Sequence, residues 1–300
     1  AVTATFYASL GLAPTPAVLG ILLFAGGIST AVFHAPAPAM IGRISGRRIG
    51  AGMSLFMAGG ELGRTLGPLL AVWAVSTWTL EGAYRVMLLG WAAAAVLYWR
   101  LRGVAARSSA PVSVRGAWGR IWRLFLPLSA MLLFRNFLVM SLSVYLPTYI
   151  TQSGATLWVA ASALTLFQGA GVAGAFASGP ISDRLGRKTT LAAAVTLAAA
   201  LLLAFLNVEG WLQVPVLLLM GFAALSMQPV TLAIVQECFP DHRAFANSLV
   251  MLVSFLVMSA STITVGAVGE AYGLRTAFTW SAFAALLALP AIWLLPLKKR

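Results

Sequence analysis

Long, almost uncharged apolar stretches follow one another along the whole chain. Charged residues make up 9% of its 300 residues, whereas a soluble domain carries roughly 25%. A water-facing surface cannot be built from so few charges, so hydrocarbon must be the outer solvent. A window of about 19 residues finds nine stretches long enough to cross a membrane. They cover residues 16–40, 50–75, 84–101, 122–148, 157–180, 189–208, 211–236, 248–268 and 276–297.

Each stretch is expected to be a helix, because hydrocarbon offers no partner to free backbone N–H and C=O groups. Barrel strands would be alternating segments of about ten residues, and these runs are longer and continuous. Residues 1–12 are apolar but too few to cross a core of about 30 Å, so we expect them to end a helix whose start is missing. The predicted fold class is an all-α polytopic membrane bundle.

Basic residues are concentrated in every second loop. The first such loop holds Arg43, Arg47 and Arg48, and the second, longer one runs through residues 102–121. By the positive-inside rule these loops face the cytoplasm, together with the C-terminus. The net charge of +13 does not indicate a nucleic-acid partner, because the basic residues lie between apolar runs rather than on one folded face. We expect an integral protein of the bacterial cytoplasmic membrane, with the lipid bilayer as its surroundings.

The basic linker 102–121 divides the chain unequally. Six stretches follow it within residues 122–300, which we expect to form a C-terminal bundle of helices 7–12. Six after the linker imply six before it, as in two-halved transporters. Residues 1–101 would then be an incomplete N-terminal bundle, from the end of helix 3 to helix 6, with the first two and a half helices missing.

The sharpest motif occupies the cytoplasmic loop between the second and third stretches after the linker. Its glycines provide backbone freedom for close approach and turning. Asp183 can pair with a neighbouring arginine or with a helix N-terminus, so the cluster could latch helices together and release them during gating. A solvated loop that simply obeys the positive-inside rule is the alternative. The residues concerned are Gly179, Asp183, Arg184, Gly186, Arg187 and Lys188.

This loop resembles the signature Gly-x-x-x-Asp-Arg-x-Gly-Arg-Lys of the major facilitator superfamily. Residues 53–68 and 235–240 are further similar to the fosmidomycin resistance branch of that superfamily. The resemblance implies a drug efflux permease of the inner membrane that exchanges substrate for protons. Two departures matter: the branch commonly has His-Pro-Glu where His34 is followed by Ala35, and often Asn where Glu61 stands. The residue that couples transport to protons in that branch therefore cannot be assigned to a position of this sequence from the resemblance alone.

The run Gly63-x-x-x-Gly67-Pro68 resembles part of the antiporter motif of proton-linked drug exporters, in the expected fifth helix. The family pattern continues with Gly-Gly, and Ala71-Val72 stand there instead. Gly-x-x-x-Gly also permits tight helix packing and proline kinks a helix. We expect tight packing here, and the antiport role remains an alternative.

Ionisable residues inside the stretches are few and costly. Glu61 and Arg64 share a helix face at i,i+3 spacing, and Arg135, followed by Asn136, lies near the middle of the seventh helix. We expect Arg135 and Arg64 to attract an anionic or polar substrate and Glu61 to exchange a proton, because substrate that occupies an arginine changes the affinity of a nearby carboxylate for protons. A purely structural Glu61–Arg64 pair is the alternative.

Three further polar residues within the stretches are candidates for substrate contact. They are His34, Gln168 and Gln228, each of which could equally bridge helices.

The predicted function is therefore proton-coupled export of small, anionic or amphiphilic compounds by a monomer through alternating access. An uptake symporter of the same fold and an inactive fragment are the alternatives. A membrane-embedded enzyme would need a nucleophile–base pair or a metal cluster, which two histidines and one cysteine, Cys238, do not supply. We expect no metal, no cofactor and no ATP-binding loop.

Overall fold

The computed structural model describes residues 1–34, 37, 40, 49–103, 118–239 and 243–296. The chain divides into two compact units, Ala1–Ala110 (unit 1) and Pro111–Arg300 (unit 2), each with its own internal contacts. Among the described residues the regular structure is helical throughout, as the sequence predicts.

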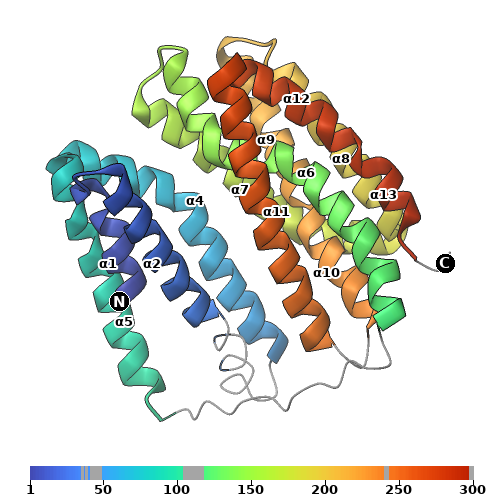
Figure 1. Ribbon diagram of the computed structural model, residues 1–300, viewed down its shortest axis with the longest axis horizontal. Helices are drawn as coiled ribbons and strands as arrows, with labels where there is room; N and C mark the ends of the chain where they lie inside the picture. Colours follow the sequence, from blue (N-terminus) through green and yellow to red (C-terminus); the bar gives the residue numbers. More distant parts are fainter. Residues whose placement is uncertain (35–36, 38–39, 41–48, 104–117, 240–242, 297–300) are drawn as a thin grey trace. The chain divides into compact units, whose positions relative to one another are not determined.

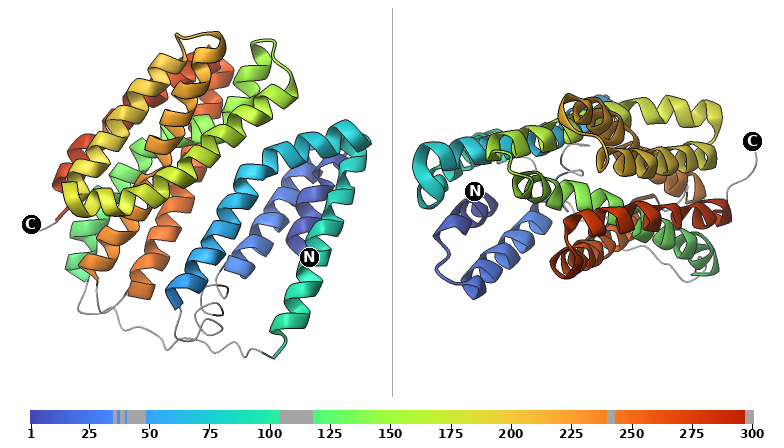
Figure 2. Two further views of the ribbon diagram at one scale, coloured as in Figure 1. Left: turned by 180° about the vertical axis from the view of Figure 1, so that it is seen from behind. Right: turned by 90° about the horizontal axis from the view of Figure 1, so that it is seen from above.

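Unit 2 is a bundle in which α7 packs on α9, α6 on α11 and α12, and α8 on α9 and α12 (Figures 1 and 2). Its helices are α6 (Trp118–Gln152), α7 (Leu157–Leu185), α8 (Arg187–Phe205), η4 (Gly210–Leu212), α9 (Gln213–Leu225), α10 (Met227–Cys238), α11 (Arg243–Tyr272), α12 (Leu274–Leu286) and α13 (Ala288–Leu294).

In its described part, unit 1 packs α1 against α2 and α5. The elements are α1 (Val2–Ala8), η1 (Ser9–Leu12), α2 (Pro16–His34), α4 (Ile49–Gly82), η3 (Ala83–Val86) and α5 (Met87–Leu101). In its described part, the buried apolar side chains are Ala37 and Ala74, whereas the whole large buried cluster belongs to unit 2. The helices of unit 1 therefore present apolar surface that only lipid or further protein can cover.

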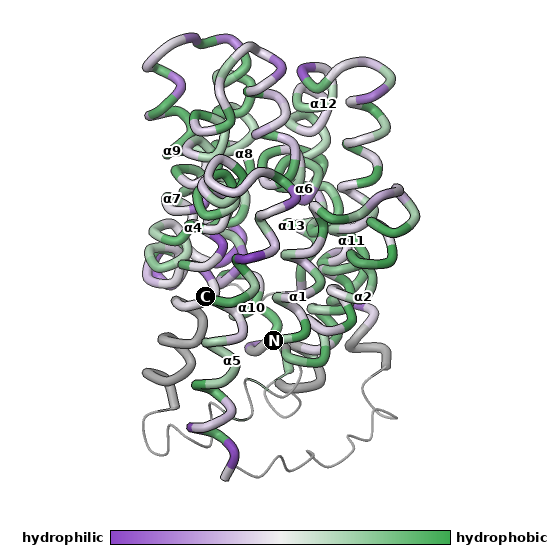
Figure 3. Tube along the Cα trace, turned by 90° about the vertical axis from the view of Figure 1, so that its left-hand side faces the viewer, coloured by the Kyte–Doolittle hydropathy of each residue, from purple (hydrophilic) through white to green (hydrophobic). Residues whose placement is uncertain are grey.

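Eight helical stretches of the described residues are long and apolar enough to cross a membrane. Figure 3 shows apolar residues along much of these helices, with hydrophilic residues gathered near many of their ends. The count differs from the nine expected because Gly59–Leu101, 43 residues long, covers two of the predicted stretches. A straight helix of that length would measure about 65 Å, twice the thickness of the hydrocarbon core.

The chain turns back within this long stretch at Thr79. Its φ of 63° and ψ of 172° interrupt the helical backbone near the end of α4. Left-handed φ is strained for a β-branched residue. The Thr79 hydroxyl accepts a hydrogen bond from the Gly82 N–H at 3.4 Å, which supports the turn. Figure 1 shows the resulting bend between α4 and α5.

Two of the expected single spans of unit 2 are broken in the structure. Helix α9 ends at Leu225, four residues before Pro229, and α12 ends at Leu286, four residues before Pro290. Proline has no N–H, so the carbonyl four residues earlier loses its helical donor and meets the pyrrolidine ring. Each span therefore consists of two consecutive helices, α9 with α10 and α12 with α13.

Glycines bring α7 and α9 into backbone contact. A Cβ added at Gly174 would overlap the carbonyl of Phe222, and one added at Gly221 would overlap the carbonyl of Phe167. A Cβ at Gly171 would meet the Leu225 side chain. Small residues allow such approach in membranes, where helix association depends on packing rather than on the hydrophobic effect.

Replacing Gly174 with alanine should therefore destabilise unit 2. The added methyl group meets backbone, which cannot rotate away, so the helices must separate, at a cost of about 1–3 kcal/mol. Gly179→Ala in the same helix is the matched control, because no atom lies within 4 Å of its added Cβ. Thermal unfolding in detergent should show a lower midpoint for Gly174→Ala alone. Equal midpoints for the two variants would contradict the contact.

Candidate functional site: a charged loop and buried polar groups

The loop between α7 and α8 is reduced to one residue, Gly186. Its φ of +88° lies in the left-handed region, which glycine adopts without strain. Its N–H donates to the carbonyl of Ser182 at 3.0 Å, and its carbonyl accepts from the Thr190 N–H at 3.1 Å. The predicted turning role of Gly186 thus has a local structural basis. A Cβ added at Gly179 would meet nothing within 4 Å among the described residues, so close approach there stays a prediction.

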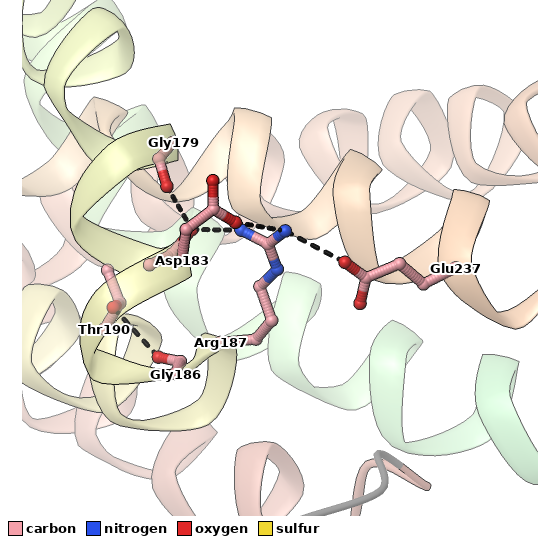
Figure 4. A network of polar contacts seen from close by, with 7 residues as sticks. Gly179, Asp183, Gly186, Arg187, Thr190 and Glu237 are labelled. Carbon is pink, nitrogen blue, oxygen red and sulfur yellow. Dashed lines mark hydrogen bonds and ion pairs between the residues drawn. The ribbon is translucent and has the colours of Figure 1, made fainter. Parts of the chain in front are cut away.

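Arg187 opens α8 directly after this turn and connects three helices (Figure 4). Its guanidinium Nη2 lies 2.8 Å from Oδ1 of Asp183 in α7 and 2.9 Å from Oε1 of Glu237 near the end of α10. Its Nη1 donates to the hydroxyl of Ser182. One guanidinium therefore satisfies acceptors on α7 and α10 at once.

The members of this network differ in exposure. The side chain of Arg187 is 16% exposed, against 57% for Asp183 and 42% for Glu237. Water competes for the carboxylates, and exposed ion pairs are worth little individually. The two ion pairs therefore connect three helix ends but add little individually to the stability of the bundle.

Glu237 is the partner that the sequence motif did not reveal. The motif suggested Arg184 or Arg187 as the partner of Asp183, and the structure gives Arg187. Glu237 lies 49 residues beyond the motif, and only its position at the basic end of a span could have drawn attention to it. The remaining basic residues differ: Arg184 is exposed, and Lys188 Nζ donates to the Trp293 carbonyl of α13 at 2.8 Å.

In unit 1, Glu61 and Arg64 form the i,i+3 pair that their spacing predicted. Oε2 of Glu61 lies 3.6 Å from Nη1 of Arg64, and the side chains are 33% and 59% exposed. Gly63 and Gly67 lie on the same helix, α4. A Cβ at either would meet nothing within 4 Å, so tight packing at these glycines is not observed among the described residues. Pro68 lies inside α4, which continues through it.

Unit 2 buries three of the predicted polar residues near the middle of its spans. Arg135 and Asn136 of α6 are 4% and 7% exposed, and Gln168 of α7 is 6% exposed. Arg135 takes part in none of the ion pairs of the described residues. Its Nε and the Oε1 of Gln168 are both buried, and neither has a hydrogen-bond partner in the part of the chain that the structure describes. Gln228 is exposed, and the side chain of His34 lies outside the described part.

Three polar side chains with the same property were not predicted. Thr65 of α4, Thr165 of α7 and Ser261 of α11 each have a buried hydroxyl oxygen without a partner among the described residues. Threonine and serine are common in membrane helices, where they usually bond to their own backbone, so sequence alone does not single them out. No group of three or more His, Cys, Asp or Glu suitable for a metal ion occurs within the described ranges.

A family model settles what kind of protein carries these features. The model of the Major Facilitator Superfamily matches residues 1–212 and 159–300. The chain belongs to the major facilitator superfamily. It is therefore an integral membrane transporter with a helical bundle fold, and it is not an enzyme.

Two superfamily proteins are similar along most of the chain. The fosmidomycin resistance protein of Escherichia coli (strain K12) is 25% identical over 279 residues, covering 89% of this chain and 68% of that protein. The uncharacterized MFS-type transporter YfnC of Bacillus subtilis (strain 168) is 25% identical over 325 residues, covering 98% of this chain and 75% of that transporter. The likeness to a drug-resistance protein agrees with the sequence resemblance noted above.

Cys238 is the next residue after Glu237, so the pKa of its thiol depends on the charge of that carboxylate. Burial raises the pKa of the Cys238 thiol, and the carboxylate of Glu237 raises that pKa further. Glu237→Gln removes the second cause, so the pKa should fall and more reactive thiolate should be present at any given pH. Because the chain has a single cysteine, alkylation by iodoacetamide across pH 7–10 measures this directly.

The expected result is a rate-against-pH curve whose midpoint moves to lower pH in Glu237→Gln. The alkylation rate on the high-pH plateau depends on how exposed the thiol is, whereas the midpoint depends on its pKa. A change in exposure and a change in pKa can therefore be told apart. Glu209→Gln, in the loop before α9, is the control and should leave the midpoint unchanged. An unshifted midpoint in Glu237→Gln would show that the carboxylate does not act on the thiol.

Proposed function

We propose that this transporter exports small anionic or amphiphilic compounds, fosmidomycin-like molecules among them, in exchange for protons across the bacterial cytoplasmic membrane. The superfamily membership and the likeness to a fosmidomycin resistance protein support export. The observation that carries the substrate class is the buried charge of Arg135.

Arg135 lies near the middle of the span Trp122–Gln152 and is 4% exposed. A guanidinium stays charged in proteins, and an uncompensated charge inside a membrane is costly. The described residues place no carboxylate in an ion pair with it. A phosphonate or carboxylate group of a substrate would compensate the charge through two parallel hydrogen bonds. Asn136 and Gln168 add neutral polar groups to the substrate site of unit 2.

Glu61 and Arg64 supply the proposed proton coupling. Oε2 of Glu61 lies beside Nη1 of Arg64, so a substrate anion that binds Arg64 competes with the Glu61 carboxylate for the guanidinium. Proton and substrate thus compete for the same pair. Gly63, Gly67 and Pro68 lie on the same helix, α4, and we propose an antiporter-like role for that segment. His34 and Gln228 are the remaining proposed substrate contacts.

The network around Arg187 is the proposed gate latch. Asp183, Arg187 and Glu237 join the cytoplasmic ends of α7, α8 and α10 in the proposed orientation. As the helix bundles move between inward- and outward-facing states, these ion pairs would form and break once in each transport cycle. Lys188 of α8 donates a hydrogen bond to the Trp293 carbonyl near the end of α13, which connects a fourth helix to α7, α8 and α10.

Glu61→Gln should abolish substrate-induced proton movement while the protein still reaches the membrane. Glutamine keeps the shape of the side chain and one acceptor oxygen but cannot gain or lose a proton near neutral pH. The measurement is proton efflux from everted vesicles challenged with fosmidomycin and related phosphonates. Glu209→Gln controls for the loss of a negative charge. Undiminished proton efflux in Glu61→Gln would refute coupling at this residue, and substrate-driven flux in the uptake direction would indicate a symporter.

Arg135→Gln should weaken the binding of phosphonates by more than about tenfold, because charge-assisted hydrogen bonds are lost. Arg135→Lys should recover only part of the affinity, since an ammonium cannot bind in the same two-pronged way. Arg102→Gln, directly after α5, is the control, because it removes an equal charge from an exposed residue that is not among the proposed substrate contacts. Titration calorimetry in nanodiscs measures the three variants. Unchanged affinity in Arg135→Gln would remove the basis for an anionic substrate.

A further inference from the structure

Arg85 of η3 lies in the turn between α4 and α5, and Figure 1 shows the place of this turn in unit 1. Its Cζ lies 5.8 Å from the ring centroid of Trp78 in α4 and 5.8 Å from the ring centroid of Tyr84. A cation within about 6 Å of an aromatic centroid is attracted by the ring. A Cβ added at Gly82 would lie 3.4 Å from Nη1 of Arg85, so the guanidinium lies over the turn. Two rings and the turn therefore hold it in place.

The charge of Arg85 has no carboxylate partner in the described part of the chain. Arg85 makes neither an ion pair nor a hydrogen bond with the described residues. Glu81, an exposed residue of the same turn, does not pair with it. An aromatic ring attracts a cation without accepting a conventional hydrogen bond, so the N–H donors of the guanidinium remain available to an oxygen acceptor.

The positive-inside rule does not account for this arginine. The charged residues between Arg64 and Arg100 are Glu81 and Arg85. The basic residues Arg100 and Arg102 lie at the other end of α5, which faces the cytoplasm in the proposed orientation. Arg85 is then at the outer surface, where basic residues are not enriched. Another interaction must favour a cation there.

Exposed leucines continue from Arg85 into the spanning part of α5. Leu88 and Leu89 are three and four residues after Arg85, which places them on the same face of the helix. Their exposed fractions are 56% and 60%. Since α5 begins at Met87 and lies within the apolar stretch Gly59–Leu101, these leucines lie deeper in the hydrocarbon than the turn. This face therefore presents a cation at the membrane boundary and apolar side chains directly below it.

We propose that this face of unit 1 is a phospholipid site. The phosphate of the lipid accepts two parallel hydrogen bonds from the guanidinium of Arg85, and an acyl chain lies along the exposed leucines. The two aromatic rings position the guanidinium. None of the residues proposed for transport takes part, so this inference does not rest on the proposed function. The residues of the site are Trp78, Tyr84, Arg85, Leu88 and Leu89.

Three probes separate the phosphate from the acyl chains. They are dioleoylphosphatidylglycerol, dioleoylglycerol, which has the same chains and no phosphate, and glycerophosphoglycerol, which has the headgroup and no chains. Native mass spectrometry of the full chain measures the affinity of each. The ratio of the two lipid affinities gives the preference for phosphate, because contacts with the chains cancel. Arg85→Gln should lower this preference about fivefold, the effect of one basic residue at a membrane surface.

Arg275→Gln is the matched control. Arg275 is an exposed arginine in the first turn of α12, and its Nη2 already donates to Oδ1 of Asn207 at 3.1 Å. Its replacement removes the same charge and should leave the preference for phosphate unchanged. An equal decrease in both variants would indicate a general effect of net charge and would overturn the site. A preference that is unchanged in Arg85→Gln would overturn it as well.

Trp78→Leu tests whether the ring positions the guanidinium. Leucine keeps an apolar side chain at the membrane boundary but offers no ring, so the preference should fall about twofold although Arg85 is retained. Trp73→Leu is the control, because the ring of Trp73 packs against Trp78 at 5.0 Å and makes no cation–π contact with Arg85. An unchanged preference in Trp78→Leu would refute the role of the ring.

The probe without acyl chains decides between a lipid and a soluble ligand. Glycerophosphoglycerol should show no binding that depends on Arg85, because it lacks the chains that contact the leucines. If it binds as tightly as dioleoylphosphatidylglycerol and loses this affinity in Arg85→Gln, the ligand is a soluble phosphate ester, and the lipid site is overturned.

Discussion

Hydrocarbon offers no hydrogen-bond partners, and the structure of this transporter follows from that constraint. Backbone groups must pair within each segment, which makes every described span helical. The exceptions are informative, because they show where something other than the helix must supply a partner. Pro229 and Pro290 each leave the carbonyl four residues earlier without its donor, and α9 and α12 end at these carbonyls. Broken helices of this kind occur in transporters where backbone lines a site.

Short and long polar side chains meet the same constraint differently. Ser226, Thr231 and Thr264 donate to carbonyls three or four residues earlier in their own chain, at 2.8 Å in each case. Such bonds need no neighbour, so these residues are tolerated anywhere along a span. The guanidinium of Arg135 and the amide of Gln168 extend too far from their own helix for this solution. Their partners must come from another helix or from a ligand, which makes them better candidates for substrate contact.

The sequence predicted the features that depend on one helix at a time. Span positions, the helical class, the Glu61–Arg64 pair and the turn at Gly186 all follow from local pattern and spacing. Features that depend on how two helices align were missed or misplaced. Tight glycine contacts were expected at Gly63 and Gly67, whereas the structure has them between α7 and α9. Spacing permits close approach, but only the rotation and register of the partner helix decide which glycines use it. Glu237 was missed for the same reason.

Arg187 connects the loop between α7 and α8 to α10, because it pairs with both Asp183 and Glu237. A guanidinium that served Asp183 alone would only stiffen the junction of α7 and α8, since those two residues are four apart in the chain. The second bond, to Glu237, connects this junction to α10, and α10 continues from the broken end of α9. Because α9 is held to α7 by backbone contact at Gly174 and Gly221, the two helices are fixed to each other within the bundle. Below the break at Ser226, α10 packs on α7, α8 and α11, and its residues Met227, Val230 and Ile234 belong to the buried cluster. The ion pair adds a polar contact to this packing near the end of α10, so the charged loop and the second half of the broken span are joined by both kinds of interaction.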